Sequence, residues 1–94
     1  MAFALALPSQ WAQQGWKVKV RDDERHRTPH VTLLCRWRSW RMSLRTGAFL
    51  DADPDPAEVP EGLVELVWGK RQVLRTRWNE LYPEHPVFAH EYER

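Results

Sequence analysis

The sequence predicts an α+β fold: a four-stranded antiparallel meander with one long C-terminal helix packed on one face, which gives two layers. Three observations lead to this prediction. Residues 16–21 alternate between apolar and basic side chains, residues 31–35 and 40–44 pair as a hairpin with its apolar residues on one side, and residues 60–82 repeat apolar residues at helical spacing.

The length of the chain suits one domain with one modest core. It has 94 residues, of which 43% are hydrophobic, and it contains 6 tryptophans. A core of this size fits a single domain over residues 1–94. We expect the core over about residues 11–82 and a C-terminal tail over 83–94, tied down only if Val87 or Phe88 finds a groove.

A short helical turn precedes the first predicted strand. Pro8 and Gly15 bracket this turn, and Ser9 is in place to cap it. A polar loop over residues 22–29 follows the strand. Alternate residues of the strand at 16–21 face the core and the solvent: Trp16, Val18 and Val20 inward, Lys17, Lys19 and Arg21 outward.

The hairpin over residues 31–44 sets the predicted register. A slip by one residue would scatter its apolar side chains over both faces of the sheet. A second turn at Thr46–Gly47 then sets Leu44 opposite Phe49 and adds the fourth strand. In the hairpin itself, a turn around Trp37 and Arg38 places three pairs of residues opposite each other on one face of the sheet. These cross-strand pairs are Val31 with Leu44, Leu33 with Met42, and Cys35 with Trp40.

The long helix is predicted after an acidic connector over residues 51–56. Pro60 suits its first position, Gly69 marks a bend, and Tyr82–Pro83 ends it. Glu58 and Glu61 suit the positive end of the helix dipole. Its apolar face consists of Leu63, Leu66, Val67, Leu74, Trp78 and Leu81. We interpret Trp68 and Trp78 as core residues rather than recognition residues.

Charge is divided unevenly along the chain, although the net charge is only +1. Residues 17–45 hold nine basic and three acidic residues, and residues 46–94 hold five basic and ten acidic residues. This uneven division of charge can indicate that one face of the protein binds a charged partner, or that two copies of the chain attract each other. The alternative is that the two halves interleave and their charges cancel locally.

The basic residues of the strands are predicted to form an uncovered sheet face, together with His30. Guanidinium groups bind phosphates bidentately and stay charged at neutral pH, so this face suits a polyanion. Trp37 at the hairpin tip suits stacking on an exposed base. The alternatives are a solvated face that keeps the sheet soluble, and an acidic protein partner. The predicted nucleic-acid-binding residues are Lys17, Lys19, Arg21, Arg36, Trp37, Arg38, Arg41 and Arg45.

Catalysis is a weaker hypothesis. His26 or His30 has the chemistry of a general acid or base for metal-independent RNA cleavage, and Arg41 and Arg45 that of stabilising the charge that develops on phosphorus. No triad or nucleophile motif accompanies these residues.

We predict no metal site and no cofactor. His26, His30 and Cys35, and separately His85 and His90, are suitable ligand types, but Pro29 interrupts the first set and Cys35 is predicted to point into the core. Asp51, Asp53 and Asp55 imitate the start of a calcium loop that then lacks its glycine and its final glutamate. These carboxylates are expected instead to screen the basic face, within one chain or between two.

The compartment is predicted to be the cytoplasm. Cys35 is the single cysteine, the opening MAFALALPSQW lacks the basic region of a secretory leader, and its apolar run is too short to span a bilayer. We expect no membrane segment.

Several short motifs of the sequence are similar to those of a known protein family. The loop DDERHRTPHV, the turn LRTGAFLD, a following VP, and a helix with the spacing W-x9-W-N resemble the small bacterial proteins grouped as domain of unknown function 4160. The likeness spans about residues 12–81. His30 matches the first histidine of the family's PPHxHV motif, while Thr28 and Thr32 replace its first proline and its second histidine. Thr46–Gly47 matches the family's turn, with Ala48 where an acid is common.

Members of this family are often found beside small antitoxin-like genes, so the resemblance implies a toxin–antitoxin role, and it implies no biochemical activity. The leading hypothesis is a small cytoplasmic binding domain, toxin–antitoxin-like, whose arginine-rich sheet face engages nucleic acid or an acidic protein. The alternatives are a metal-independent ribonuclease-type toxin and a structural homodimer in which the acidic connector of one copy meets the basic face of the other.

Overall fold

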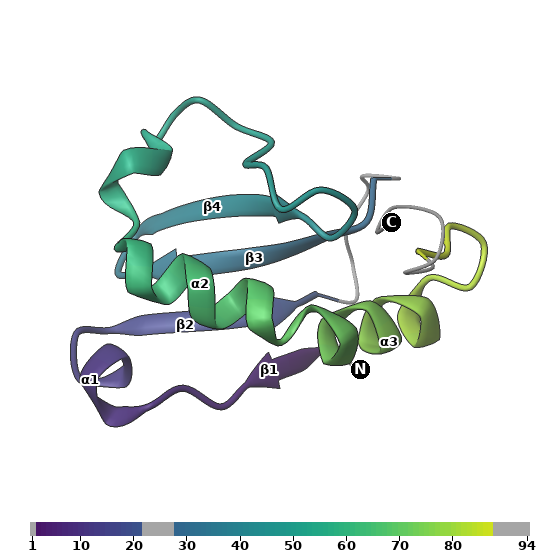
Figure 1. The fold of residues 1–94 in the computed structure, drawn as a ribbon, viewed down its shortest axis with the longest axis horizontal. Coiled ribbons are helices and arrows are strands. Elements are labelled where there is room, and N and C mark those ends of the chain that lie inside the picture. The colour runs from purple at the N-terminus through teal and green to yellow at the C-terminus, as the bar shows by residue number, and fades with distance from the viewer. Residues whose placement is uncertain (1, 22–27, 88–94) are drawn as a thin grey trace.

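The computed structural model describes residues 2–21 and 28–87. Its helices lie over one face of a single sheet, so the molecule has two layers (Figure 1). The elements in chain order are β1 (Phe3–Leu5), α1 (Ser9–Ala12), β2 (Trp16–Val20), β3 (His30–Cys35), β4 (Arg38–Ser43), a 3-10 turn η1 (Pro56–Glu58), α2 (Glu61–Gly69) and α3 (Arg71–Leu81).

The sheet is a four-stranded antiparallel meander in the order β1-β2-β3-β4, which confirms the α+β class. The four strands are not the predicted four. The edge strand β1 pairs with β2 through Ala4 and Lys19 and was not foreseen, because three residues are too few to show alternation. The predicted strand around Phe49 is reduced to one bridge, between Met42 and Phe49.

The β3–β4 register differs from the predicted one by two residues. Val31 lies opposite Met42 and Leu33 opposite Trp40. A shift by an even number keeps Val31, Leu33, Trp40 and Met42 on the predicted core face, since side chains alternate with a period of two. The loop is also shorter, with only Arg36 and Trp37 between the strands. Arg36 has φ 60°, the left-handed conformation that tight hairpin loops require and that glycine or asparagine would have signalled in the sequence.

The predicted single long helix is wrong in one respect: two helices, α2 and α3, meet at Lys70. Lys70 has φ −100° and ψ 15°, outside the helical range, and directly follows Gly69, where the sequence predicted a bend. The N-terminal turn also differs, because Pro8 occupies the N-cap of α1 and Ser9 is its first residue, with no side-chain cap.

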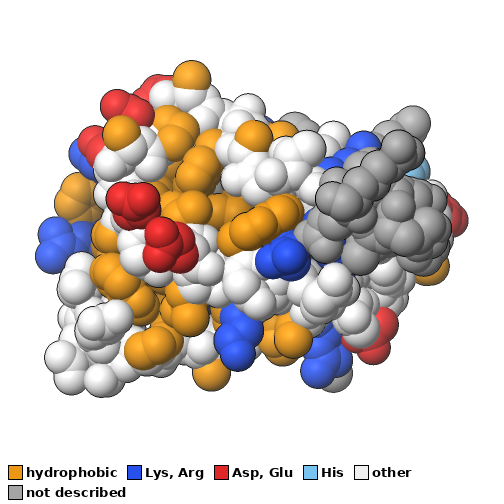
Figure 2. All heavy atoms as spheres, viewed as in Figure 1, with side chains coloured by type: hydrophobic (Ala, Val, Ile, Leu, Met, Phe, Trp, Pro, Cys, Tyr) orange, Lys and Arg blue, Asp and Glu red, His pale blue; other side chains and the backbone are white. Residues whose placement is uncertain are grey.

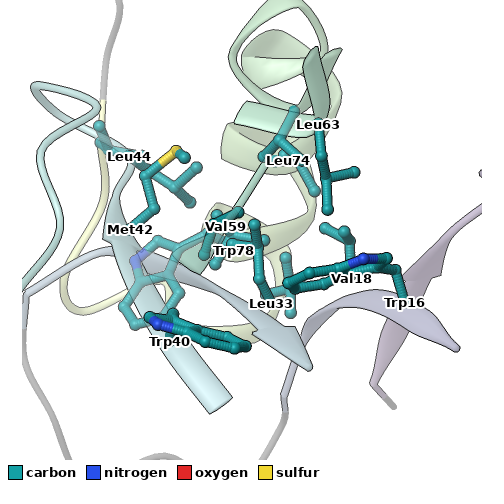
Figure 3. Packing of buried hydrophobic residues seen from close by; sticks show 14 residues of the cluster. Trp16, Val18, Leu33, Trp40, Met42, Leu44, Val59, Leu63, Leu74 and Trp78 are labelled. Atoms are coloured by element: carbon teal, nitrogen blue, oxygen red, sulfur yellow. The ribbon is translucent and has the colours of Figure 1, made fainter. Parts of the chain in front are cut away.

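The core fills the space between the sheet and the two helices (Figure 3). Residues from three strands and both long helices meet there, and the rings of Trp16 and Trp40 lie 5.3 Å apart. Cys35 lies at the margin of this core rather than inside it, with its Sγ 3.6 Å from the carbonyl oxygen of Gln14. The residues at its centre include Val18, Leu33, Trp40, Met42, Leu63, Val67, Leu74 and Trp78.

The segment after α3 is tied to that helix. The Asn79 side chain donates to the carbonyl oxygen of Val87 (2.9 Å) and accepts from the amide of Val87 (2.7 Å). The indole of Trp78 donates to the carbonyl oxygen of His85 (2.7 Å). Val87 is 1% exposed, and Phe3 packs against the same cluster, so the core extends beyond residues 11–82 at both ends. Within the described residues, no helix combines the length and apolar character needed to cross a bilayer.

Candidate functional site

The predicted basic face is divided by the structure into separate groups. Lys17, Lys19 and Arg41 lie on the sheet face that points away from the helices, where Lys19 and Arg41 flank Thr32 from the two neighbouring strands. Arg21 follows the far end of β2, and its carbonyl oxygen accepts from the hydroxyl of Tyr82. Arg45 follows the far end of β4, in the turn where the Ser43 amide donates to Ala48. The residues do not share one surface.

Arg41 is neutralised within its own chain. Its Nε and Nη2 donate to the two carboxylate oxygens of Asp51 at 2.7 and 2.5 Å, a bidentate pair. The backbone brings the two together, because the amide of Leu50 donates to the carbonyl oxygen of Arg41 and so holds the acidic connector along β4. The expected screening of the basic face by connector carboxylates occurs here inside one chain.

A second pair joins the two oppositely charged halves of the sequence. The Nη1 of Arg38, at the start of β4, donates to the Oε2 of Glu58 in η1 at 2.6 Å. Figure 2, which views the helix-covered side, shows several acidic side chains near η1 and the beginning of α2, with basic side chains beside them. Local cancellation of charge therefore accounts for part of the asymmetry along the chain.

The position of His30 contradicts its predicted place on an uncovered face. Its side chain is 1% exposed and lies against Trp78, with ring centroids 5.3 Å apart. Its Nδ1 is 2.9 Å from the carbonyl oxygen of Thr28, to which it donates in the tautomer that this contact favours. A ring that is 1% exposed is poorly placed to act on a substrate at the surface. His26, the other catalytic candidate, lies outside the described residues.

The candidate metal ligands serve other purposes or lie apart. In residues 2–21 and 28–87, no three His, Cys, Asp or Glu side chains come together as a metal site. Asp55 accepts from the amide of Ala57 and caps η1, while its carbonyl oxygen accepts from the indole of Trp40. His90 is outside the described part of the chain.

The β3–β4 hairpin end carries a pocket of about 550 Å³. Three tryptophans line it, from β2, the hairpin loop and β4, together with two arginines and one glutamate. Trp16 and Trp40 are almost fully buried and form its inner wall, whereas Trp37 is 83% exposed. The lining residues that matter for its chemistry are Trp16, Arg36, Trp37, Arg38, Trp40 and Glu58.

The exposed Trp37 follows from the geometry of the tight loop. A two-residue loop directs its side chains beyond the end of the strands, so Trp37 has no neighbouring layer to cover it. An exposed indole beside two guanidinium groups can stack on a flat ring and hold an anionic group next to it. The pocket thus suits a ligand that combines an aromatic ring with negative charge.

The sequence identified part of this site. It predicted Arg36, Trp37 and Arg38 as binding residues, and these three lie together at the hairpin end. It missed Trp16 and Glu58 as part of the same pocket. No local pattern links Glu58 to Arg38, because the two are 20 residues apart and meet only through the path of the connector.

Comparison of the chain with protein-family models, curated proteins and solved structures finds no match. The resemblance to the proteins of domain of unknown function 4160 stays a prediction, and the chemistry of the pocket is what indicates a function.

Proposed function

We propose that this protein is a small cytoplasmic binding protein that engages single-stranded nucleic acid at the end of the β3–β4 hairpin. The observation that carries the proposal is Trp37, 83% exposed at the mouth of a pocket between Arg36 and Arg38. Stacking of a base on such an indole contributes about 1–3 kcal/mol and tolerates any sequence. Duplex bases are already stacked, so the single strand is the better ligand.

Electrostatics supports a modest, local contact. Arg36 and Arg38 line the pocket, and Lys17, exposed on β2, lies at the same end of the sheet opposite Leu34. Because Arg38 is paired with Glu58, the count includes Arg36 and Lys17, and two neutralised phosphates on a single strand give a slope of log affinity against log salt of about −1.4. The seven basic residues of the predicted interface acting together would give about −5. The ion pair of Arg41 with Asp51 favours the smaller value.

The alternatives have weaker support. Buried His30 disfavours a ribonuclease that uses this histidine. An acidic protein partner or a homodimer through the acidic connector requires charges that are already engaged, since Asp51 holds Arg41 and Glu58 holds Arg38. The toxin–antitoxin relationship implied by the resemblance is compatible with nucleic-acid binding and adds no contact of its own.

The test is fluorescence anisotropy of labelled single-stranded RNA and DNA at about 50 and about 200 mM salt. We expect salt-dependent binding that Trp37→Ala weakens about ten-fold. Arg77→Gln is the matched control, because Arg77 is an exposed arginine on α3 outside the pocket. Circular dichroism of each variant checks that the fold is intact.

Three results would overturn the proposal. Equal binding by Trp37→Ala and the unaltered protein would show that the hairpin end is not the interface. Loss of binding in the double variant Arg41→Gln/Arg45→Gln, with binding intact in Trp37→Ala, would show that these two arginines and not the hairpin end form the interface. A salt-dependent dimer in light scattering, with no binding to either nucleic acid, would favour the structural homodimer.

A further inference from the structure

Glu58 is the acidic group of the pocket and is held in a defined position. Asp55 caps the 3-10 turn that carries it, and Arg38 binds one of its oxygens, Oε2, at 2.6 Å. The Glu58 side chain nevertheless remains 43% exposed. A carboxylate that is oriented by the protein and open to solvent is arranged to accept hydrogen bonds from a ligand.

The ion pair with Arg38 engages one oxygen of Glu58, and the exposed part of this carboxylate would repel a phosphate placed against it. It suits instead a ligand that carries hydrogen-bond donors as well as negative charge. Each carboxylate oxygen has two lone pairs, so Glu58 can keep its bond to Arg38 and still accept two more bonds side by side. A quaternary or methylated ammonium also suits tryptophan and carboxylate. Arg36 and Arg38 line the same pocket and disfavour a cation.

Among the common bases, guanine alone presents two adjacent donors on its Watson–Crick edge, N1–H and the 2-amino group. Adenine and cytosine each offer one amino donor beside a ring nitrogen acceptor, and uracil places its one N–H between two carbonyl oxygens. Those acceptors would face the Glu58 carboxylate and repel it. A pair of parallel hydrogen bonds to one edge is the arrangement that discriminates bases most strongly.

We infer that this pocket is a guanine-selective site, in which the base stacks on Trp37, Glu58 accepts from its N1–H and 2-amino groups, and Arg36 binds the adjoining phosphate. This inference rests on the proposed function and adds a base preference to it. A pocket of about 550 Å³ is within the usual range for small-ligand sites and holds a purine with its sugar.

The test uses U-rich single-stranded RNA oligonucleotides with one variable central base: guanine, inosine or adenine. We expect the guanine oligonucleotide to bind about ten-fold more tightly than the adenine one, with inosine in between because it lacks only the 2-amino group. In Glu58→Gln the ratio of guanine to adenine affinity falls to about one. The ratio is the readout because removal of a negative charge raises affinity for every RNA alike.

Glu61→Gln is the matched control, since Glu61 is an exposed acid in the first turn of α2 that does not line the pocket. It should raise affinity slightly and leave the ratio unchanged. The Arg38–Glu58 pair is exposed on both sides, so Glu58→Gln is expected to fold.

Equal, salt-dependent and Trp37-dependent binding of all three oligonucleotides would overturn the guanine inference and leave the proposed function standing. A guanine preference that survives Glu58→Gln would overturn the role of Glu58. Absence of binding by any of them would remove both proposals.

Discussion

At the residue scale, the basic side chains of this protein differ in role although they look alike in the sequence. Arg75 is the clearest case, because it is 2% exposed in the core. Its Nε donates to the carbonyl oxygen of Leu44 at 2.7 Å and its Nη2 to that of Arg45 at 3.5 Å. Its guanidinium also lies over the ring of Trp68, 5.4 Å from the centroid. This arginine joins α3 to the backbone that follows β4.

Replacement of Arg75 tests this structural role. In Arg75→Met the hydrocarbon stem is kept, but the buried carbonyl oxygen of Leu44 loses its charged donor. We expect the free energy of unfolding to fall by about 2–3 kcal/mol, which lowers the urea midpoint by about 1–2 M. Arg77→Met, on the exposed side of the same helix, loses a contact with the ring of Phe3 and a surface ion pair with Glu80, and should lower it by no more than about 1 kcal/mol. Similar urea curves for the two variants would contradict the assignment.

Sequence and structure agree least at this scale. The sequence showed that Arg36, Arg38, Arg41 and Arg45 are basic, and side-chain alternation alone suggested that they act together. Their roles depend on which acids the connector brings near them. Asp51 reaches Arg41 and Glu58 reaches Arg38 because the chain doubles back along β4, a path that no local pattern encodes.

At the element scale, the junction of α2 and α3 and the turn after β4 depend on two different glycines. Gly69 ends α2, and a Cβ added there would meet no atom within 4 Å. Gly47 has φ 81°, and a Cβ there would come within 3.2 Å of the ring of Trp68. At Gly69, helix propensity alone determines how a substitution changes stability. At Gly47, a substitution is opposed both by backbone strain and by the packing of Trp68.

These two positions give opposite predictions for the same substitution. Gly69→Ala should raise the free energy of unfolding by about 0.5–1 kcal/mol, because alanine loses less backbone entropy in a helix. Gly47→Ala should lower it by about 1 kcal/mol or more. Thermal unfolding of both variants, followed by circular dichroism, measures the difference. A loss of stability in Gly69→Ala would show that the bend needs glycine itself.

The elements themselves were largely predictable, and their ends were not. The period-two pattern predicted the core faces of β2, β3 and β4, because the even shift in register kept their apolar side chains towards the helices. His30, at the start of β3, is the exception, since it lies buried against Trp78. The two-residue loop at Arg36 was hidden because a positive φ in arginine is held by the strands on either side. Edge strand β1 has only three residues, and its pairing with β2 is a tertiary property.

At the scale of the whole molecule, the last described residues complete the core. Val87 is almost fully buried, and both backbone groups of Val87 bond to the Asn79 side chain. The stacked rings of Trp78 and Tyr82, 4.1 Å apart, lie on the same side of α3. The segment after α3 is therefore part of the folded unit at least as far as Val87.

Asn79→Ala tests this docking. The substitution removes the hydrogen-bond partner of both the amide and the carbonyl of Val87. We therefore expect the free energy of unfolding to fall by about 1–3 kcal/mol. The rate of amide hydrogen exchange at Val87 should rise by more than the fall in the free energy of unfolding predicts, because the segment after α3 can then open without unfolding of the whole protein. Glu80→Ala, one residue further on an exposed face of α3, is the control. Unchanged exchange at Val87 in Asn79→Ala would rule out the clamp.

The sequence by itself determined the fold class, the inward and outward faces of the strands, the bend near Gly69 and the exposure of Trp37, because these follow from the local period of apolar residues and from turn chemistry. The tertiary structure alone decided which arginines are paired, why His30 is buried, and where the pocket lies. Each of these depends on contacts between segments distant in the chain, and the return path of the connector along β4 sets the pairs of Arg38 and Arg41.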